Sequence, residues 1–299
     1  MAMGCSQSLT QEAQTLSQAR KGHVTQVNPQ RGAKEPVDVP PASLFHIVSY
    51  AGANGPLAAY LTPDSGDGKR HPAIVWITGG DCNSIGDMWT PASRDNDQTA
   101  AAYRKAGLIM MFPSLRGGNQ NPGAKEGFYG EVDDVIAATQ YLAQQKYVDP
   151  ARIYLGGHST GGTLALLVAE RSNAYRAVFA YGPVADVSTY SVDSGFIPFN
   201  VSDREEVKLR SPGYWLSSIH NPTWVIEGGK QGNIRSVKLM EKSCTNPKVT
   251  FIEVLNGSHF TVLAPVNDLI AKKLINDTGA AGTLTLTSDE VNNTYDSSR

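Results

Sequence analysis

The chain has 299 residues, of which 40% are hydrophobic and 18% charged, and its formal net charge is −2. A chain of this length and apolar content can bury one large core or two modest ones. The small net charge and the lack of a long lysine or arginine run argue against a nucleic-acid groove and against a basic membrane-binding face.

Cysteine and histidine spacing points away from a disulfide framework and from a metal site. The three cysteines, Cys5, Cys82 and Cys244, are odd in number and far apart in the sequence. The six histidines never fall in HxH or HxxxH spacing. We therefore expect reduced thiols, no metal and no cofactor.

The first residues lack the hydrophobic centre of a signal peptide, and no apolar stretch has the length of a membrane span. The expected protein is soluble and, by default, cytoplasmic. Gly4-Cys5-Ser6 is also typical of the start of a mature bacterial lipoprotein whose signal has been removed, which would place the protein in the periplasm. An ordinary cysteine in a floppy terminus is the alternative.

Three segments differ in composition. Residues 1 to 43 are polar with little periodicity and are predicted to form a loosely attached arm. From residue 44 to residue 277, short apolar runs alternate with helical segments, which indicates a mostly parallel sheet flanked by helices. Residues 278 to 299 are rich in Thr, Ser, Asp and Asn and are predicted to be a tail.

Eight apolar runs within the central segment are predicted strands. The first two, at residues 44 to 50 and 57 to 62, flank a glycine-containing turn and are expected to form an antiparallel hairpin. The other six predicted strands span residues 73 to 78, 108 to 113, 152 to 156, 177 to 182, 223 to 228 and 249 to 254. Apolar residues at helical spacing predict an amphipathic helix over residues 131 to 146, with further helices near 235 to 243 and 262 to 275.

Residues 186 to 222 interrupt the alternation of strands and helices. They carry four large aromatic residues, Phe196, Phe199, Tyr214 and Trp215. By its position the segment is either a cap over the strand ends, where ligands of α/β sheets bind, or a surface insertion packed down by its own aromatic side chains.

The sequence GHSTG at residues 157 to 161 follows a predicted strand and precedes a run of small and apolar residues typical of a helix. At a sharp strand-to-helix turn, side chains two before and two after the central residue would collide. Gly157 and Gly161 therefore favour a nucleophile elbow at Ser159, against the alternative of a glycine-rich turn with an accidental serine. The N–H of Thr160 would begin the helix as an unpaired donor at a positive dipole end, which suits an oxyanion.

A serine nucleophile needs a general base, usually a histidine oriented by a carboxylate. His259 lies after the last predicted strand and before the last predicted helix, where the order serine, acid, histidine places the base. A purely structural histidine is the alternative. His158 adjoins the serine but is expected to point away from the reacting centre.

The acid is expected just past the strand at residues 223 to 228, but the next five residues contain no aspartate. Glu227, at the tip of that strand, is favoured because its extra methylene lets it reach the histidine from an earlier position. Asp186 is the alternative acid, unless it caps the segment that follows, and a site with no dedicated acid is the third possibility. The second oxyanion donor is expected in the glycine-containing loop at residues 78 to 81, with Gly80 favoured.

Together these motifs resemble the α/β hydrolase superfamily, and within it the catalytic domain of the prolyl oligopeptidase family and the related dienelactone hydrolase-like enzymes. The resemblance covers about residues 44 to 277 and is carried by VDPARIYLGGHSTGG and NGSHFTVLAP, with support from SLRGGNQNPG, GEVDDVIAA and LRSPGYWLSSIHNPTWVIEG. It implies an α/β hydrolase fold with a mostly parallel eight-stranded sheet, helices on both faces and a small cap insertion. Ser159 is implied as nucleophile, His259 as base and the N–H of Thr160 as an oxyanion donor.

Two positions depart from the family pattern. Where the family usually has a histidine-glycine pair followed by the catalytic aspartate, this chain has Glu227-Gly228 and then Gln231. A tyrosine that often donates to the oxyanion is replaced by Thr78.

The expected function is that of a serine hydrolase that cleaves an ester, a thioester or a small amide through an acyl-enzyme. The alternatives are a prolyl oligopeptidase-like peptidase acting on small peptides and a non-catalytic protein of the same fold that binds a ligand where the enzymes have their active site. The expected partner is a small-molecule or short peptide substrate, and no nucleic acid.

Overall fold

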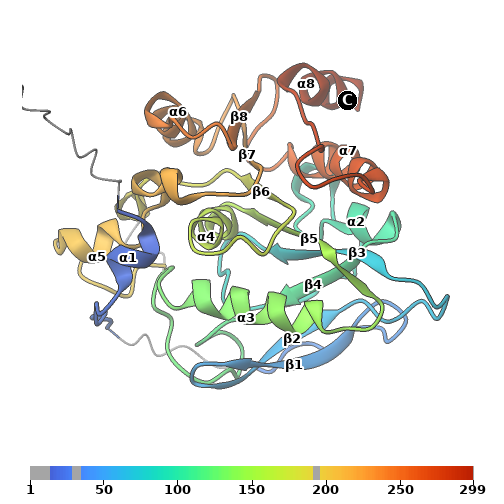
Figure 1. Cartoon of the computed structure of the whole chain (residues 1–299), viewed down its shortest axis with the longest axis horizontal. Helices are drawn as coiled ribbons and strands as arrows, with labels where there is room; N and C mark the ends of the chain where they lie inside the picture. Colours follow the sequence, from blue (N-terminus) through green and yellow to red (C-terminus); the bar gives the residue numbers. More distant parts are fainter. Residues whose placement is uncertain (1–13, 29–34, 191–195, 299) are drawn as a thin grey trace, which may run out of the picture.

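The structure, a computed structural model, describes residues 14–28, 35–190 and 196–298 (Figure 1). Cys5, on which the lipoprotein interpretation depends, lies outside these residues. Within the described ranges, no helix combines the length and the apolar composition needed to cross a bilayer.

An eight-stranded sheet with the order β1-β2-β4-β3-β5-β6-β7-β8 forms the centre of the protein. The strands are β1 (His46–Gly52), β2 (Gly55–Leu61), β3 (His71–Ile77), β4 (Ile109–Pro113), β5 (Val148–His158), β6 (Ala177–Tyr181), β7 (Thr223–Gly228) and β8 (Val249–Val254). β1 and β2 form the predicted antiparallel hairpin, and β2 also pairs antiparallel with β4. All other pairs are parallel, so the predicted mostly parallel sheet is confirmed.

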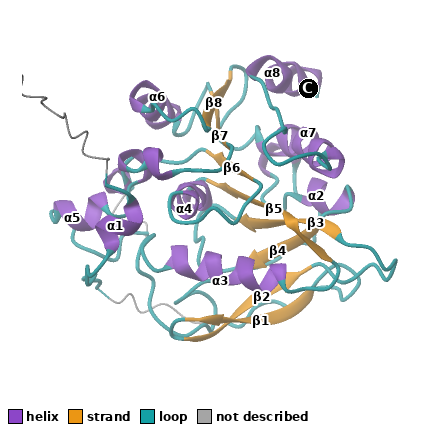
Figure 2. Ribbon diagram, viewed as in Figure 1, coloured by secondary structure: helices purple, strands orange, loops and turns teal. Residues whose placement is uncertain are grey.

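Helices cover both faces of the sheet (Figure 2). They are α1 (Leu16–Arg20), α2 (Ala101–Lys105), α3 (Glu131–Ala143), α4 (Thr160–Ala169), α5 (Arg204–Lys208), α6 (Ile234–Ser243), α7 (Leu263–Asn276) and α8 (Ser288–Ser297). α3, α4 and α6 pack into one apolar core, whereas α2, α7 and α8 pack into a second core across the sheet.

The central strands are apolar along their whole length because both of their faces are buried. In β3, Val75 and Ile77 enter the first core, whereas Ile74 and Trp76 enter the second. The continuous apolar runs in the sequence therefore reflect two cores that share one sheet.

Five neighbouring parallel strands, β3 and β5 to β8, end at the same edge of the sheet. The loops that leave this edge carry the residues that the sequence singled out for chemistry. Functional sites of open α/β sheets form at this carboxyl edge.

The described part of the N-terminal arm is firmly attached, so the predicted loose attachment is wrong for residues 14–28. Leu16 is fully buried in the first core. Arg20 donates hydrogen bonds to the backbone oxygens of Leu209, Phe128 and Tyr129 at 2.7 to 3.0 Å. Hydropathy could not reveal this attachment because, apart from Leu16, it depends on polar contacts.

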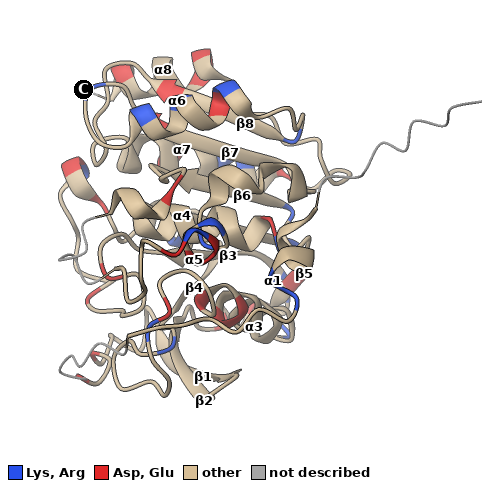
Figure 3. Ribbon diagram, turned by 90° about the vertical axis from the view of Figure 1, so that its left-hand side faces the viewer, with Lys and Arg blue, Asp and Glu red and all other residues tan. Residues whose placement is uncertain are grey.

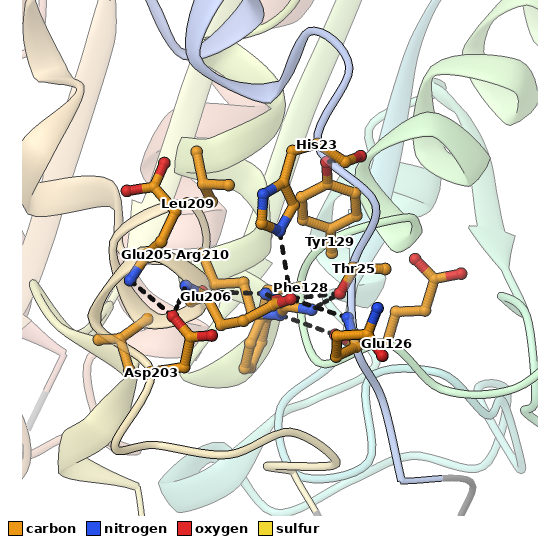
Figure 4. Close-up of polar contacts among 12 residues, drawn as sticks. His23, Thr25, Glu126, Phe128, Tyr129, Asp203, Glu205, Glu206, Leu209 and Arg210 are labelled. Carbon is orange, nitrogen blue, oxygen red and sulfur yellow. Dashed lines mark hydrogen bonds and ion pairs between the residues drawn. The ribbon is translucent and has the colours of Figure 1, made fainter.

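The arm continues along a buried ionic cluster near α5 (Figure 4). His23 Nε2 lies 3.2 Å from Glu206 Oε1, and Thr25 donates to the other oxygen of Glu206 at 2.9 Å. Arg210, which is fully buried, pairs with Glu206 and contacts Thr25. The arm and the segment that contains α5 are therefore held together as one unit.

Residues 186–190 and 196–222 form α5 and the 3₁₀ turns η2 (Val187–Thr189), η4 (Pro212–Tyr214) and η5 (Leu216–Ser218). The aromatic residues Phe199 and Trp215 are buried in the first core, whereas Tyr214 is 51% exposed. Figure 3 shows acidic and basic residues side by side at α5, on the outer side of this segment.

The C-terminal residues pack on the domain. Val291 and Tyr295 of α8 are buried in the second core, and the indole N–H of Trp224 donates to the Leu286 carbonyl at 3.0 Å. The Tyr295 hydroxyl lies 2.8 Å from Thr261 Oγ1, in the loop that follows β8. The segment predicted as a tail therefore contains a helix that contacts this loop.

Candidate active site

Ser159 occupies a strained turn between β5 and α4. Its φ is 55° and its ψ is −115°, a backbone conformation that residues with a side chain rarely adopt. Glycine is required at positions 157 and 161 because a side chain at either position would clash with the backbone. A Cβ on Gly157 would lie 2.4 Å from the Gly161 carbonyl oxygen, and a Cβ on Gly161 would lie 2.2 Å from the Ile77 oxygen. This is the geometry of a nucleophile elbow.

The backbone of Ser159 is held on both sides. Its N–H donates to the Tyr181 carbonyl of β6 at 2.8 Å, and its own carbonyl accepts from the Thr163 N–H of α4 at 2.9 Å. These bonds secure the strained conformation, and Ser159 is half-buried at the end of β5.

Buried Glu227 and partly buried His259 form a hydrogen-bonded pair. His259 Nδ1 lies 2.9 Å from Glu227 Oε1, and the side chains are 12% and 0% exposed, respectively. The same oxygen accepts the backbone N–H of Asn233 at 2.6 Å. Since an ionised carboxylate only accepts hydrogen bonds, the proton of the neutral His259 ring lies on Nδ1, and Nε2 is free to accept one.

The loop after β8 brings this pair to the elbow. The ring centroid of His259 lies 4.4 Å from that of His158, the residue before Ser159. The imidazole and the serine, distant in sequence, thus belong to adjoining loops at one edge of the sheet.

The alternative acid has a local role. Asp186 caps η2, and its Oδ1 accepts from the backbone N–H and the hydroxyl of Ser188 at 2.8 and 2.6 Å. Its other oxygen lies 3.4 Å from the Tyr214 hydroxyl. Gln231, at the place of the family's aspartate, is exposed. The structure therefore brings Glu227 to His259 and leaves Asp186 in the capping role weighed as its alternative.

Two hydrogen bonds anchor the loop after β3, one to the elbow and one to the turn before α2. The Thr160 hydroxyl donates to the Gly80 carbonyl at 2.8 Å. The Gly79 N–H donates to Gln98 Oε1 at 3.1 Å, so that N–H is already engaged. Gly80 adopts a φ of +74°, which glycine reaches without strain.

Sequence reasoning missed the part played by His158. The ring is fully buried, with Nε2 2.9 Å from the His259 carbonyl oxygen and Nδ1 2.8 Å from Gln98 Nε2. Burial, together with the neighbouring His259, lowers the pKa of His158 to about 3, so its ring is neutral at ordinary pH.

Two glycines enclose the Glu227–His259 pair. A Cβ on Gly182 would lie 2.5 Å from His259 Cε1, and a Cβ on Gly232 would lie 2.4 Å from Glu227 Oε1. The available signal was the position of Gly182 at the end of the strand predicted for residues 177 to 182, where glycine indicates a close approach. Across the described ranges, no group of three or more His, Cys, Asp or Glu residues could hold a metal ion.

Comparisons with known proteins relate the chain to a peptidase family. Residues 95–226 match the model of the prolyl oligopeptidase family. The chain is 28% identical over 184 residues to prolyl oligopeptidase A of Amanita bisporigera, an alignment that covers 58% of this chain and 23% of that enzyme. It is 30% identical over 145 residues to the uncharacterized peptidase YtmA of Bacillus subtilis, covering 44% of this chain and 55% of the relative.

Among solved structures, a puromycin-hydrolyzing peptidase of Mycobacterium tuberculosis superimposes with a TM-score of 0.61 at 18% identity. The superposition covers 80% of this chain and 40% of that structure. At 18% identity, this similarity shows a common fold and nothing about activity. The chain spans only about a fifth of the length of the fungal relatives it matches, with 17% and 23% coverage of the first two.

Proposed function

This chain contains an α/β hydrolase domain of the prolyl oligopeptidase family, and we propose that it is a serine hydrolase with Ser159 as nucleophile, His259 as general base and Glu227 as acid. The observation that carries the proposal is the hydrogen-bonded Glu227–His259 pair beside the strained turn at Ser159. The non-catalytic alternative was motivated by the lack of an aspartate just after β7. Glu227 provides a carboxylate for His259 in its place.

The mechanism follows from the roles of these atoms. Ser159 Oγ attacks the carbonyl carbon of the substrate while His259 Nε2 takes its proton. The N–H groups of Thr160 and Gly80 donate to the resulting oxyanion, because the Gly79 N–H is engaged by Gln98. The tetrahedral intermediate collapses when His259 returns the proton to the leaving group, which leaves an acyl ester on the serine.

Water completes the cycle. His259 takes a proton from the water molecule that attacks the acyl ester, and the serine oxygen leaves with that proton. During both steps the carboxylate of Glu227 accepts from Nδ1–H and stabilises the positive charge on the imidazole ring.

We propose small acyl derivatives as substrates: esters, thioesters and small amides, including short peptides. Peptide bonds are included because the relatives are named as peptidases.

A substrate panel tests the proposal. Wild type and Ser159→Ala would be assayed with p-nitrophenyl esters of increasing acyl length and with unblocked aminoacyl anilides. We expect turnover of the short-chain esters, slower but measurable cleavage of the anilides, and loss of all turnover in Ser159→Ala. Anilides left intact would restrict the enzyme to esters, and equal turnover in the two proteins would contradict a serine mechanism.

A further inference from the structure

We propose that Gln98 and His158 form a hydrogen-bonded clamp that positions the loop of the general base relative to the oxyanion loop. The inference rests on the proposed function, since it assigns positioning residues to that same site. The two side chains connect three segments: the loop after β3, the turn before α2 and the loop after β8.

The direction of every bond in the clamp follows from groups that have only one possible role. At one end, the Gly79 N–H can only donate, so the Gln98 side-chain oxygen faces it at 3.1 Å. Gln98 Nε2 then faces His158 Nδ1 at 2.8 Å and donates to it. At the other end, the His259 carbonyl can only accept, so His158 Nε2–H donates to it at 2.9 Å.

This chain of bonds requires one form of the His158 ring, neutral with its proton on Nε2. A proton on Nδ1 would face the amide hydrogens of Gln98 and break the contact. The burial of the ring, and its 4.4 Å separation from the ring of His259, disfavour a second charge there. His158 is therefore a fixed donor that does not compete with His259 for protons.

The side-chain amide of Gln98 is held in one orientation by its hydrogen bonds. Its oxygen accepts from Gly79, and its nitrogen donates both to His158 and to Asn96 Oδ1, the latter at 2.9 Å. An amide with each of its groups engaged keeps one orientation. The His259 backbone is thereby tied to the same side chain that holds the loop of Gly80.

The consequence is geometric precision at the reacting atoms. His259 is held by Glu227 through its ring and by His158 through its carbonyl, so the clamp provides the second point that defines the direction of Nε2. A misplacement of about 1 Å in such a group costs about a hundredfold in rate. We therefore expect loss of the clamp to lower kcat more than it raises KM.

Four variants test the clamp. His158→Phe and Gln98→Met remove its hydrogen bonds while keeping similar volume, His158→Gln keeps a donor for the His259 carbonyl, and Gln145→Met is the matched control. Gln145 is half-buried just after the end of α3, and its side chain donates to the Tyr141 carbonyl of that helix at 2.9 Å.

With p-nitrophenyl acetate, we expect kcat of His158→Phe and Gln98→Met to fall about ten- to a hundredfold. KM should change less than about threefold, and fluorophosphonate labelling of Ser159 should slow by the same factor as kcat. His158→Gln should recover most of the rate, and Gln145→Met should match wild type. Unchanged kcat in the first two variants would overturn the proposal, as would His158→Gln being as slow as His158→Phe with both folded.

A spectroscopic readout separates this inference from the proposed function. In the nitrogen NMR spectrum of wild type, the His158 ring should show the neutral, Nε2-protonated form from about pH 5 to pH 8. Gln98→Met should show a mixture of the two neutral forms. If the protein proves inactive yet these spectra appear, the proposed function fails and the clamp stands, whereas an Nδ1-protonated His158 in wild type refutes the clamp.

Discussion

Replacing Glu227 with glutamine isolates the effect of its negative charge. Both donors to this carboxylate, His259 Nδ1 and the Asn233 N–H, bond to the same oxygen, Oε1. The described residues offer Oε2 no hydrogen bond. The amide oxygen of glutamine can therefore take the place of Oε1 and keep both contacts. The ring would keep its proton on Nδ1, and only the charge would be lost.

The expected magnitude follows from that loss. A hydrogen bond to a charged group is worth about 1 to 2 kcal/mol more than a neutral one. The attraction between two unit charges about 4 Å apart is about 4 kcal/mol at the effective dielectric of a protein site. The transition state, with its positive imidazole, should thus rise by about 2 to 4 kcal/mol, which lowers kcat/KM about 30- to 1,000-fold.

The assay compares Glu227→Gln with Glu227→Ala and Asp186→Asn on one activated ester. The alanine variant also loses the orientation of the ring, so we expect it to be about 10⁴-fold slower than wild type. Asp186→Asn should retain wild-type rates because that side chain caps η2. Wild-type activity in Glu227→Gln, or a glutamine variant as slow as the alanine variant, would refute the reasoning.

Gly182→Ala should lower kcat/KM at least a hundredfold, because its Cβ would lie 2.5 Å from His259 Cε1. Gly66→Ala is the control, because Gly66 also has a positive φ but a Cβ there would meet nothing within 4 Å. It should lower the free energy of unfolding by about 1 kcal/mol and leave activity unchanged. Equal kinetics in the two variants would contradict this reasoning. Since the pKa of His158 falls from 6.5 in the unfolded chain to about 3 when folded, the unfolded state binds the extra proton between these values, and stability falls as the pH drops through that range. In urea unfolding, the stability advantage of wild type over His158→Phe should shrink by up to about 1.4 kcal/mol per pH unit below about pH 6.5, and parallel curves would exclude the effect. Arg20→Met should cost about 2 to 4 kcal/mol in the same assay, because it removes a buried guanidinium from three backbone carbonyls; a loss below about 0.5 kcal/mol would mean that the arm contributes little.

The sheet could be predicted because its strands are apolar runs bounded by turn residues, and the glycines around Ser159 mark the elbow by a local steric requirement. Glu227 could be proposed because it lies at a strand tip, yet its contact with His259 depends on a loop folding back from another strand. No local pattern encodes such a contact.

Gln98 and His158 were not identified, because their roles arise only when three loops meet. Arg20 was missed for a related reason, since a polar arm that binds backbone carbonyls leaves no hydropathy period. The helix at residues 288 to 297 has few apolar positions, and its packing depends on Val291 and Tyr295.

Tandem mass spectrometry of protein treated with a fluorophosphonate tests the central claim most directly. The account predicts one phosphonyl group, on the peptide that contains Ser159, with no label after Ser159→Ala and much slower labelling after His259→Ala. A folded protein that stays unlabelled, or that carries the label on another serine, would contradict it.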